Sequence, residues 1–359
     1  MIRRRESQAE VLLENNNLSI KIAGNMRVRT IDVILKEMLL KKRKAEYVIE
    51  SAMILDLSEL VFISPAAATG IVCLCSALMS NKMTVVANPS AFYMRRPPEN
   101  VLTYLSTFHF FTQLINKANL LGCEDLAAFE SERTERKSKV KKIDGPDNEE
   151  KPIVLPMRTI PQKGAAERDH IFEQACLQFI NEIYPTFRKL FSSVHFNFYD
   201  GDIYQFKEAN GELFVNVFEH SRSWGIASIH ANPRSGTIVS YCDIGVGMKG
   251  SVNSSPKARK EYDVFETDTV AIKWALKEGN SSKVGGNGRG LNVVEEFVLQ
   301  RKGNIELRSG SSLFRKKPGD KPGVENWSIS SVPWFPGTQI NFFVPCMDRI
   351  DNGAGRWEA

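Results

Sequence analysis

The chain has 359 residues, of which 42% are hydrophobic and 25% are charged, and its formal net charge is +5. This length and composition are ordinary for a globular protein of about two domains. The basic clusters at residues 3–5, 41–44 and 133–142 lie far apart, are interleaved with acids and carry no aromatic–basic motif. Nucleic acid is therefore not an expected partner.

The cysteines and the apolar runs point to a reducing, aqueous compartment. None of the six cysteines forms a Cys-x-x-Cys pair, so neither a zinc site nor a disulfide framework is expected. The apolar patch at residues 11–13 is too short for a signal peptide. The most apolar run, residues 65–79, is too short to span a bilayer and is typical of a buried helix. We expect a cytoplasmic protein that makes no membrane contact.

The first third of the chain alternates predicted strands and helices. Period-two alternation or continuous apolar residues predict strands, and apolar residues at helical spacing predict helices. Strands are expected at 18–23, 52–57, 61–63 and 83–87, and helices at 28–40, 65–79 and 101–114. This alternation predicts an α/β layer domain, which we place at residues 1–123.

One segment of this first domain has a recognisable layout. Residues 54–70 form an apolar strand, an aspartate, a short loop and a helix that opens with small residues. The layout resembles STAS domains (the sulfate-transporter and anti-sigma-antagonist fold) over about residues 15–122. Regulatory members of that family carry a phosphorylated serine in an Asp-Ser-Ser-Gly-like turn, whereas residues 64–67 are Ser-Pro-Ala-Ala, and Ser64 occupies the position of the family's acid. The resemblance implies a domain that docks a protein partner rather than a phospho-switch.

Residues 124–165 break the alternation and are interpreted as a charged linker. The run 130–139 is charged and lacks apolar periodicity, and Asp-Gly-Pro follows at 144–146. An amphipathic helix is expected at 165–184, where the pattern resumes. A second domain is therefore predicted at 166–350, with a short tail at 351–359.

A helix predicted at 211–221 carries a polar face. Glu212, Asn216 and His220 follow one another at four-residue spacing, so they lie one turn apart along the same face. An amide oxygen is a suitable ligand for Mg²⁺, and a carboxylate can polarise a water molecule. The alternative interpretation is a solvated polar face without a function.

Two glycine-containing turns follow this helix. At 238–248 a strand ends in Asp243, and Gly245 and Gly247 follow before Met248. A buried carboxylate at a strand end can accept a hydrogen bond from an exocyclic amine, which selects adenine over guanine; the alternative is an aspartate that caps a simple turn. At 281–291 a glycine-rich loop runs into a predicted helix at 291–299, an arrangement that binds anions. Its spacing matches neither a P-loop nor a Rossmann fingerprint.

The order of these motifs resembles the GHKL superfamily, which includes gyrase, heat-shock chaperone, histidine-kinase and mismatch-repair ATPases. The polar helix matches the N box Glu-x-x-x-Asn, the strand end matches Asp-x-Gly-x-Gly, and the loop matches Gly-x-Gly-x-Gly-Leu. A fourth element, residues 336–342, matches the family's terminal Gly-Thr strand. The resemblance covers about residues 205–346. It implies a Bergerat-type ATPase domain, so the expected fold class is α/β, an α+β two-layer sandwich.

The resemblance also implies roles for individual residues. At the adenine end, Asp243 would accept from N6 with help from Thr338 through water, while Gly245 and Gly247 shape the pocket and Met248 lies over the base. At the phosphate end, Glu212 would be the general base and Asn216 the Mg²⁺ ligand, with His220 at a position that varies between branches. The loop residues implied to surround the phosphates are Gly286, Gly288, Arg289, Gly290 and Leu291. Residues 249–285, with a short helix at 269–278, would be a mobile ATP lid, from which Lys283 reaches the γ-phosphate.

Several outputs of ATP binding are open at this point. A histidine kinase needs an H box, and the sequence around His170 lacks both its acid and its proline. An anti-sigma-like serine/threonine kinase would need a separate protein substrate, because the acceptor turn is lost. We prefer slow ATP hydrolysis in which lid closure switches partner contacts or assembly, with an ATP-dependent homodimer as one form. A non-catalytic, ATP-bound interaction scaffold is the remaining alternative. The architecture by itself suggests bacterial signalling or defence.

Overall fold

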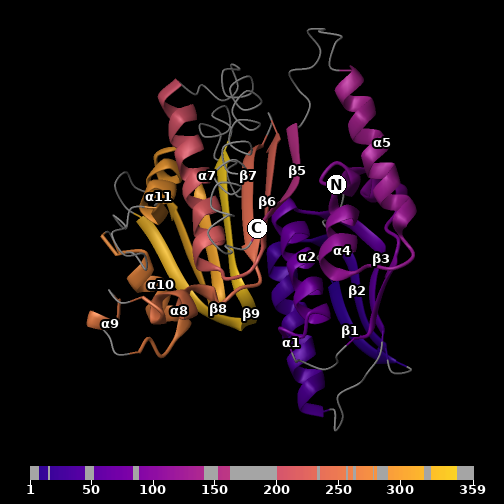
Figure 1. The fold of residues 1–359 in the computed structure, drawn as a ribbon, viewed down its shortest axis with the longest axis horizontal. Coiled ribbons are helices and arrows are strands. Elements are labelled where there is room, and N and C mark those ends of the chain that lie inside the picture. Colours follow the sequence, from indigo (N-terminus) through magenta and orange to yellow (C-terminus); the bar gives the residue numbers. More distant parts are fainter. Residues whose placement is uncertain are drawn as a thin grey trace, which may run out of the picture. The chain divides into compact units, whose positions relative to one another are not determined.

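The computed structural model divides the chain into two compact units, residues 1–144 and 145–358, which we call the N-terminal and C-terminal units (Figure 1). The described residues are 8–14, 17–44, 52–83, 89–140, 153–161, 200–232, 235–255, 258–261, 264–277, 279–280, 290–318 and 325–345. Within these ranges, no helix combines the length and the apolar character needed to cross a membrane.

The N-terminal unit contains a four-stranded sheet in the order β1–β2–β3–β4. The first pair is antiparallel, and the other two pairs are parallel. The strands are β1 (Gln8–Glu14), β2 (Asn17–Met26), β3 (Ala52–Ile63) and β4 (Ala91–Arg95). The helices are α1 (Val28–Lys44), α2 (Pro65–Met79), α3 (Glu99–Ser106), α4 (Phe110–Ala118) and α5 (Glu124–Val140).

Most of the sequence predictions for this unit are confirmed. The strands expected at 18–23, 52–57 and 61–63 fall within β2 and β3, and the first two predicted helices match α1 and α2. The single helix expected at 101–114 is wrong, because His109 has a positive φ of 57° and separates α3 from α4. Of the strand expected at 83–87, all but Met83 lies outside the described residues; β4 is the strand that pairs with β3.

Helix α2 is buried along nearly its whole length, as its apolar sequence predicts. It begins after Ser64, whose Oγ accepts a hydrogen bond from the amide of Ala67 (3.2 Å), and Pro65 occupies the first helical position. A serine cap and a proline without an N–H together reduce the number of unpaired amides at a buried helix start. The Ser-Pro-Ala-Ala turn at residues 64–67 is therefore an N-terminal helix cap.

The predicted linker at 124–165 is wrong for its first part, because residues 124–140 form α5. Glu130 of this helix is fully buried, and its carboxylate accepts from the amides of Phe111 (3.0 Å) and Thr112 (2.9 Å) and from the Thr112 hydroxyl (2.7 Å). These amides belong to the first turn of α4, and the side chain of its own N-cap residue, His109, does not cap them. Glu130 thus caps α4 from another helix. Burial raises the pKa of Glu130 to about 7.

The last part of the predicted linker contains β5 (Ile153–Ile160), an edge strand of the C-terminal unit. The sheet there is antiparallel, in the order β5–β6–β7–β9–β8. The other strands are β6 (Gly225–Asn232), β7 (Gly236–Asp243), β8 (Asn304–Pro318) and β9 (Glu325–Pro345). The helices are α7 (Asp200–His220), α8 (Gly247–Asn253), α9 (Ala258–Glu261), α10 (Asp268–Ala275) and α11 (Gly290–Gln300).

Helices α7 and α11 lie side by side on one face of this sheet (Figure 1). Phe206 of α7, Phe297 of α11 and Phe342 of β9 make edge-to-face contacts, with ring centroids 5.7–6.4 Å apart, at the centre of the apolar core. This helix layer on a sheet confirms the predicted α+β two-layer class. The helices expected at 211–221, 269–278 and 291–299 correspond to the second half of α7, to α10 and to α11; the one expected at 165–184 lies outside the described residues.

Candidate functional site

A cavity of about 560 Å³ lies in the C-terminal unit, within the range of small-molecule binding sites. Its lining comes from α7, β7, α8, α10, α11 and β9, so segments far apart in the sequence meet there. The lining includes most of the described residues predicted to bind nucleotide: Glu212, Asn216, His220, Asp243, Gly247, Met248, Gly290, Leu291 and Thr338.

Helix α7 supplies the acidic wall of the cavity, with Glu208, Glu212 and Asn216 at four-residue spacing and Glu219 close by. Two buried residues fix this helix on the sheet. The Tyr241 hydroxyl of β7 donates to the Asn210 side-chain oxygen (3.1 Å), and the Asn210 amide donates to the carbonyl of Phe206 (2.8 Å). Sequence analysis missed this pair, because each residue alone looks like an ordinary member of its helix or strand.

Glu212 lies against the first residue of α11. A Cβ atom at Gly290 would be 2.5 Å from Glu212 Oε2, so a residue without a side chain allows this approach. Helix N-termini carry partial positive charge and attract anions. The carboxylate of Glu212 and the start of α11 therefore form a polar end of the cavity, where the helix start favours a negatively charged group.

The opposite end is built around Asp243, the buried last residue of β7. Its Oδ1 accepts from the amide of Gly245 (2.8 Å), and Gly245 in turn is packed against Ser221, the residue after α7, where a Cβ would be 1.9 Å from the carbonyl oxygen. Gly245 is not among the described lining residues. A glycine at this position allows the segments that follow α7 and β7 to approach closely, whereas the resemblance assigned Gly245 to the wall of an adenine pocket.

Gly337 and Ser309 hold this end together; the sequence placed Gly337 in the Gly-Thr segment without giving it a role, and it did not mark Ser309. Gly337 has a φ of +81°, and a Cβ there would be 2.2 Å from the backbone oxygen of Asp243. Ser309 Oγ of β8 accepts from the amide of Met248 (2.8 Å) and lies 3.3 Å from Thr338 Oγ1. Ser309 thereby ties the start of α8 to the Gly-Thr segment of β9. No local motif distinguishes it from the other serines of β8.

The predicted lid contains a small structure of its own. Val252, Ala258, Phe265, Ala271 and Trp274 form an apolar cluster, and Val252 and Trp274 also line the cavity. The cluster is attached to β8 through Asp268, whose Oδ2 accepts from the amide (2.8 Å) and hydroxyl (3.2 Å) of Ser311. The lining residue Trp274 was not singled out from the sequence, where it appears only as one apolar position of a short helix.

The glycine-rich loop is not part of the described structure. Lys283, Gly286, Gly288 and Arg289 lie outside the described residues, and only Gly290 and Leu291, which begin α11, are placed at the cavity. No group of three or more His, Cys, Asp or Glu side chains suited to a metal occurs in the parts of the chain that the structure describes. An Mg²⁺ ion at Asn216 would take its other ligands from phosphate and water, as this ion commonly does.

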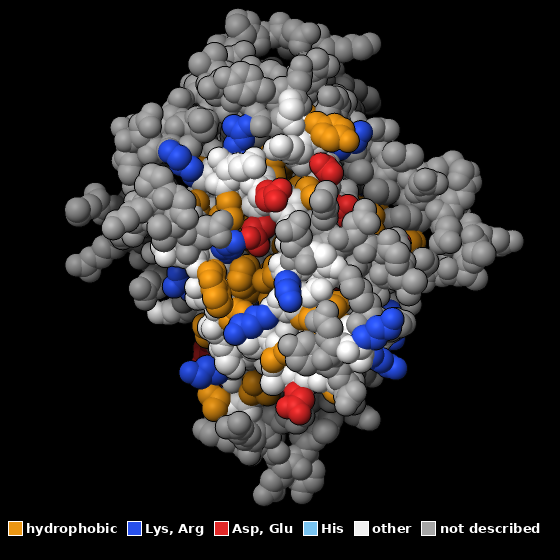
Figure 2. Space-filling model, turned by 90° about the vertical axis from the view of Figure 1, so that its left-hand side faces the viewer, with side chains coloured by type: hydrophobic (Ala, Val, Ile, Leu, Met, Phe, Trp, Pro, Cys, Tyr) orange, Lys and Arg blue, Asp and Glu red, His pale blue; other side chains and the backbone are white. Residues whose placement is uncertain are grey.

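The cavity has a mixed chemical character. On the side of the molecule drawn in Figure 2, a group of acidic side chains borders an area of hydrophobic ones. The lining combines carboxylates of α7 with apolar groups such as Trp274, Leu291 and Ile340. Such a site can bind a flat apolar ring at one end and a charged group, through a cation, at the other.

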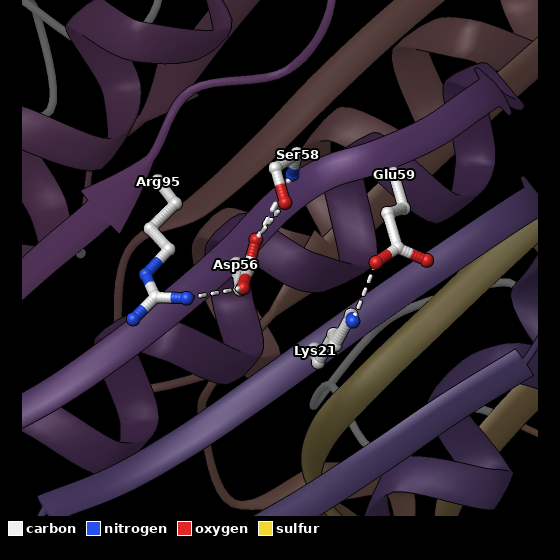
Figure 3. A network of polar contacts seen from close by, with 5 residues as sticks. All are labelled: Lys21, Asp56, Ser58, Glu59 and Arg95. Atoms are coloured by element: carbon white, nitrogen blue, oxygen red, sulfur yellow. Dashed lines mark hydrogen bonds and ion pairs between the residues drawn. The ribbon is translucent and has the colours of Figure 1, made fainter.

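A second cluster of charged side chains, in the N-terminal unit, has its own internal partners (Figure 3). Buried Asp56 accepts from the Ser58 hydroxyl (2.6 Å) and amide (3.0 Å) and from Arg95 (3.2 Å). Burial raises the pKa of Asp56, but these hydrogen bonds and the positive charge of Arg95 outweigh burial and lower it below the ordinary value. Lys21 pairs with Glu59 (2.5 Å) beside them. The cluster is therefore interpreted as part of the sheet structure and not as a ligand site.

No protein-family model matches the chain, and no curated protein matches it significantly. The assignment of a function depends on the cavity and on the order of the motifs that surround it.

Proposed function

We propose that the C-terminal unit is a GHKL-type ATPase domain of the Bergerat fold that binds Mg-ATP and hydrolyses it slowly. In this proposal, closure of residues 249–285 over the nucleotide changes the contacts that the STAS-like N-terminal unit makes with a protein partner, or changes assembly. The observation that carries the proposal is the cavity itself, because its lining brings together residues of three motifs: Glu212 and Asn216 of the N box, Asp243 and Gly247 of the Asp-x-Gly-x-Gly turn, and Thr338 of the Gly-Thr segment.

The adenine end of the proposed site is at Asp243. One carboxylate oxygen accepts from Gly245, which fixes the orientation of the group, and a carboxylate has further lone pairs that can accept from the adenine N6 amine. Met248 and Thr338 line the same cavity, one on each side of Ser309. Guanine carries a carbonyl oxygen where adenine carries the amine, so a carboxylate here disfavours guanine.

The phosphate end is at Glu212 and Asn216, one helical turn apart on α7. The Asn216 side-chain oxygen would ligate Mg²⁺, and Glu212 would orient and deprotonate the attacking water. The start of α11 favours the developing negative charge. Binding alone would not require Glu212, so its position at this end favours hydrolysis over a purely structural role for ATP.

We propose that ATP binding and hydrolysis change the partner contacts or assembly of the protein, and that no residue of the chain is phosphorylated. Ser64 caps α2 and is only 6% exposed, which makes it a poor phosphate acceptor. A γ-phosphate can instead act through contacts that differ between an open and a closed arrangement of residues 249–285. No acceptor residue is needed for such a switch.

The test compares phosphate release from Mg-ATP by the wild type and the Glu212→Gln variant. Loss of a general base lowers turnover by about 10²-fold or more, while ATP binding, followed by calorimetry, persists. The matched control is Glu296→Gln, which neutralises an exposed glutamate on α11. ATP binding without release by the wild type would contradict the ATPase and leave a scaffold; transfer of label to an added protein would instead identify a kinase.

A further inference from the structure

The strand pair β8–β9 extends beyond the rest of the C-terminal sheet. The two strands pair from Asn304 and Phe343 to Pro318 and Glu325, whereas β7 pairs with β9 only from Gln339 to Pro345. Residues 326–334 of β9, which we call the arm edge, pair with β8 at 326–331 and pass through a register shift at 332–334, and no described strand pairs with their other side. Their other side presents backbone N–H and C=O groups that need partners.

The arm is held firmly in place on one of its faces. Phe314 of β8 belongs to the main core, and Ile329 of β9 is packed against it. Lys316 forms an ion pair with Glu295 of α11, and the Lys273 ammonium of α10 lies 6.0 Å from the centroid of the Trp327 ring. A strand fixed in this way can receive another strand at little further cost in conformational entropy.

The arm edge lacks the protection that exposed strand edges usually have. No charged residue occurs between Asn326 and Phe335, and Trp327 and Trp334 are 58% and 45% exposed. The paired segment of β8 carries Arg315, Lys316 and Lys317 in succession. Charged residues on an edge strand oppose pairing with other chains, so β8 is protected, while the arm edge has only Pro333 to limit pairing.

We propose that the arm edge pairs antiparallel with the arm edge of a second copy of this chain. Two identical edges without charge meet with no like-charge repulsion, whereas two copies of the β8 edge would bring their basic runs together. A two-fold axis through the arm edge gives each copy the same contacts. Ser328 and Ser330, both exposed and two residues apart on one face, then lie close to their counterparts and can form cross-strand hydrogen bonds.

The test uses charge to block and then restore the pairing. Sedimentation velocity and light scattering of the wild-type chain should give twice the monomer mass at micromolar concentration. Ser328→Lys with Ser330→Lys places like charges opposite one another, as does Ser328→Asp with Ser330→Asp, and each double variant alone should dissociate at least tenfold more readily. Mixing the two variants should restore the dimer, because opposite charges then face each other.

Recovery of the dimer in the mixture would show that both variants are folded, because misfolded chains could not form it. Ser235→Lys, in the exposed turn between β6 and β7, is the control and should leave the dimer unchanged. A monomeric wild type would overturn the proposal and leave the arm edge to a strand of another protein. A dimer that survives in both double variants would also overturn it, because the interface would then lie elsewhere.

Discussion

The polar clusters of the N-terminal unit and the α7 wall of the C-terminal cavity differ in what their polar side chains do. In the N-terminal unit the buried Asp56, Ser64 and Glu130 each bond to nearby backbone or side-chain groups, and Ser64 and Glu130 cap helix starts. In the C-terminal unit Glu212 and Asn216 are only half-buried and line a cavity. Polarity within a fold is therefore not itself a sign of function. What distinguishes a site is polar groups from several elements that converge on a space large enough for a ligand.

The largest expected effect concerns the glycine that closes the Asp243 end. Gly337 and Gly279 have nearly equal φ, +81° and +80°, but a Cβ at Gly279 would meet nothing within 4 Å. Gly279→Ala should lower the free energy of unfolding by about 1 kcal/mol through backbone strain. Gly337→Ala should lower it by about 3 kcal/mol or more, because the new Cβ also meets the backbone of Asp243. Chemical denaturation measures both losses. Equal losses would mean that the Asp243 end can relax.

The next effect tests the proposed preference of the cavity for adenine. Asp243→Asn should weaken ATP binding by about tenfold or more, because an amide donor would face the adenine N6 amine. The melting temperature of the unliganded protein should change little, since the Asn side-chain oxygen can still accept from Gly245. A thermal-shift titration with ATP measures both quantities. Unchanged ATP affinity would rule out Asp243 as the adenine acceptor. Asp243 would then have a structural role only, like Asp56 in the N-terminal unit.

In the N-terminal unit, Glu130 should make stability depend on pH. Its folded-state pKa of about 7 lies above the ordinary value of 4.5. Its stabilising contribution is therefore complete below about pH 4.5 and is lost as the pH rises through about 7. The free energy of unfolding should fall by about 3 kcal/mol at most over this range.

Urea denaturation at pH 5 and pH 8 measures this dependence. Glu130→Gln should remove most of it, while Glu124→Gln, at an exposed position of the same helix, should leave it intact. A slope that survives in Glu130→Gln would show that another group titrates.

The smallest effect concerns the cap of α2. Ser64→Ala removes the acceptor for the Ala67 amide and should cost about 1 kcal/mol of unfolding free energy. Ser90→Ala, at an exposed position before β4, should change it by less than about 0.5 kcal/mol. Nucleotide binding by the C-terminal unit should be the same in both variants. A loss of binding in Ser64→Ala alone would reveal coupling between the capped turn and the cavity.

Much of the fold followed from local pattern. The alternation at β2, the apolar run of α2 and the amphipathic pattern of α1 each carry their signal within one element, so periodicity identified them. The order of the motifs likewise predicted which residues would meet, and Glu212, Asn216, Asp243 and Thr338 do line one cavity. Fixed spacing within a motif is information that a linear sequence contains directly.

Tertiary structure decided the features whose partners are distant in the chain. The charged run at 124–140 has little apolar periodicity, and α5 is held partly by the contact of Glu130 with α4. Ser309 lies 61 residues from Met248, and Gly337 lies beside Asp243 only because β9 pairs with β7. The residues that flank such a position in the sequence do not indicate these distant contacts. The sequence by itself determined most of the helices and strands and the residue types that line the cavity, and packing determined which polar groups became structural and which came to line it.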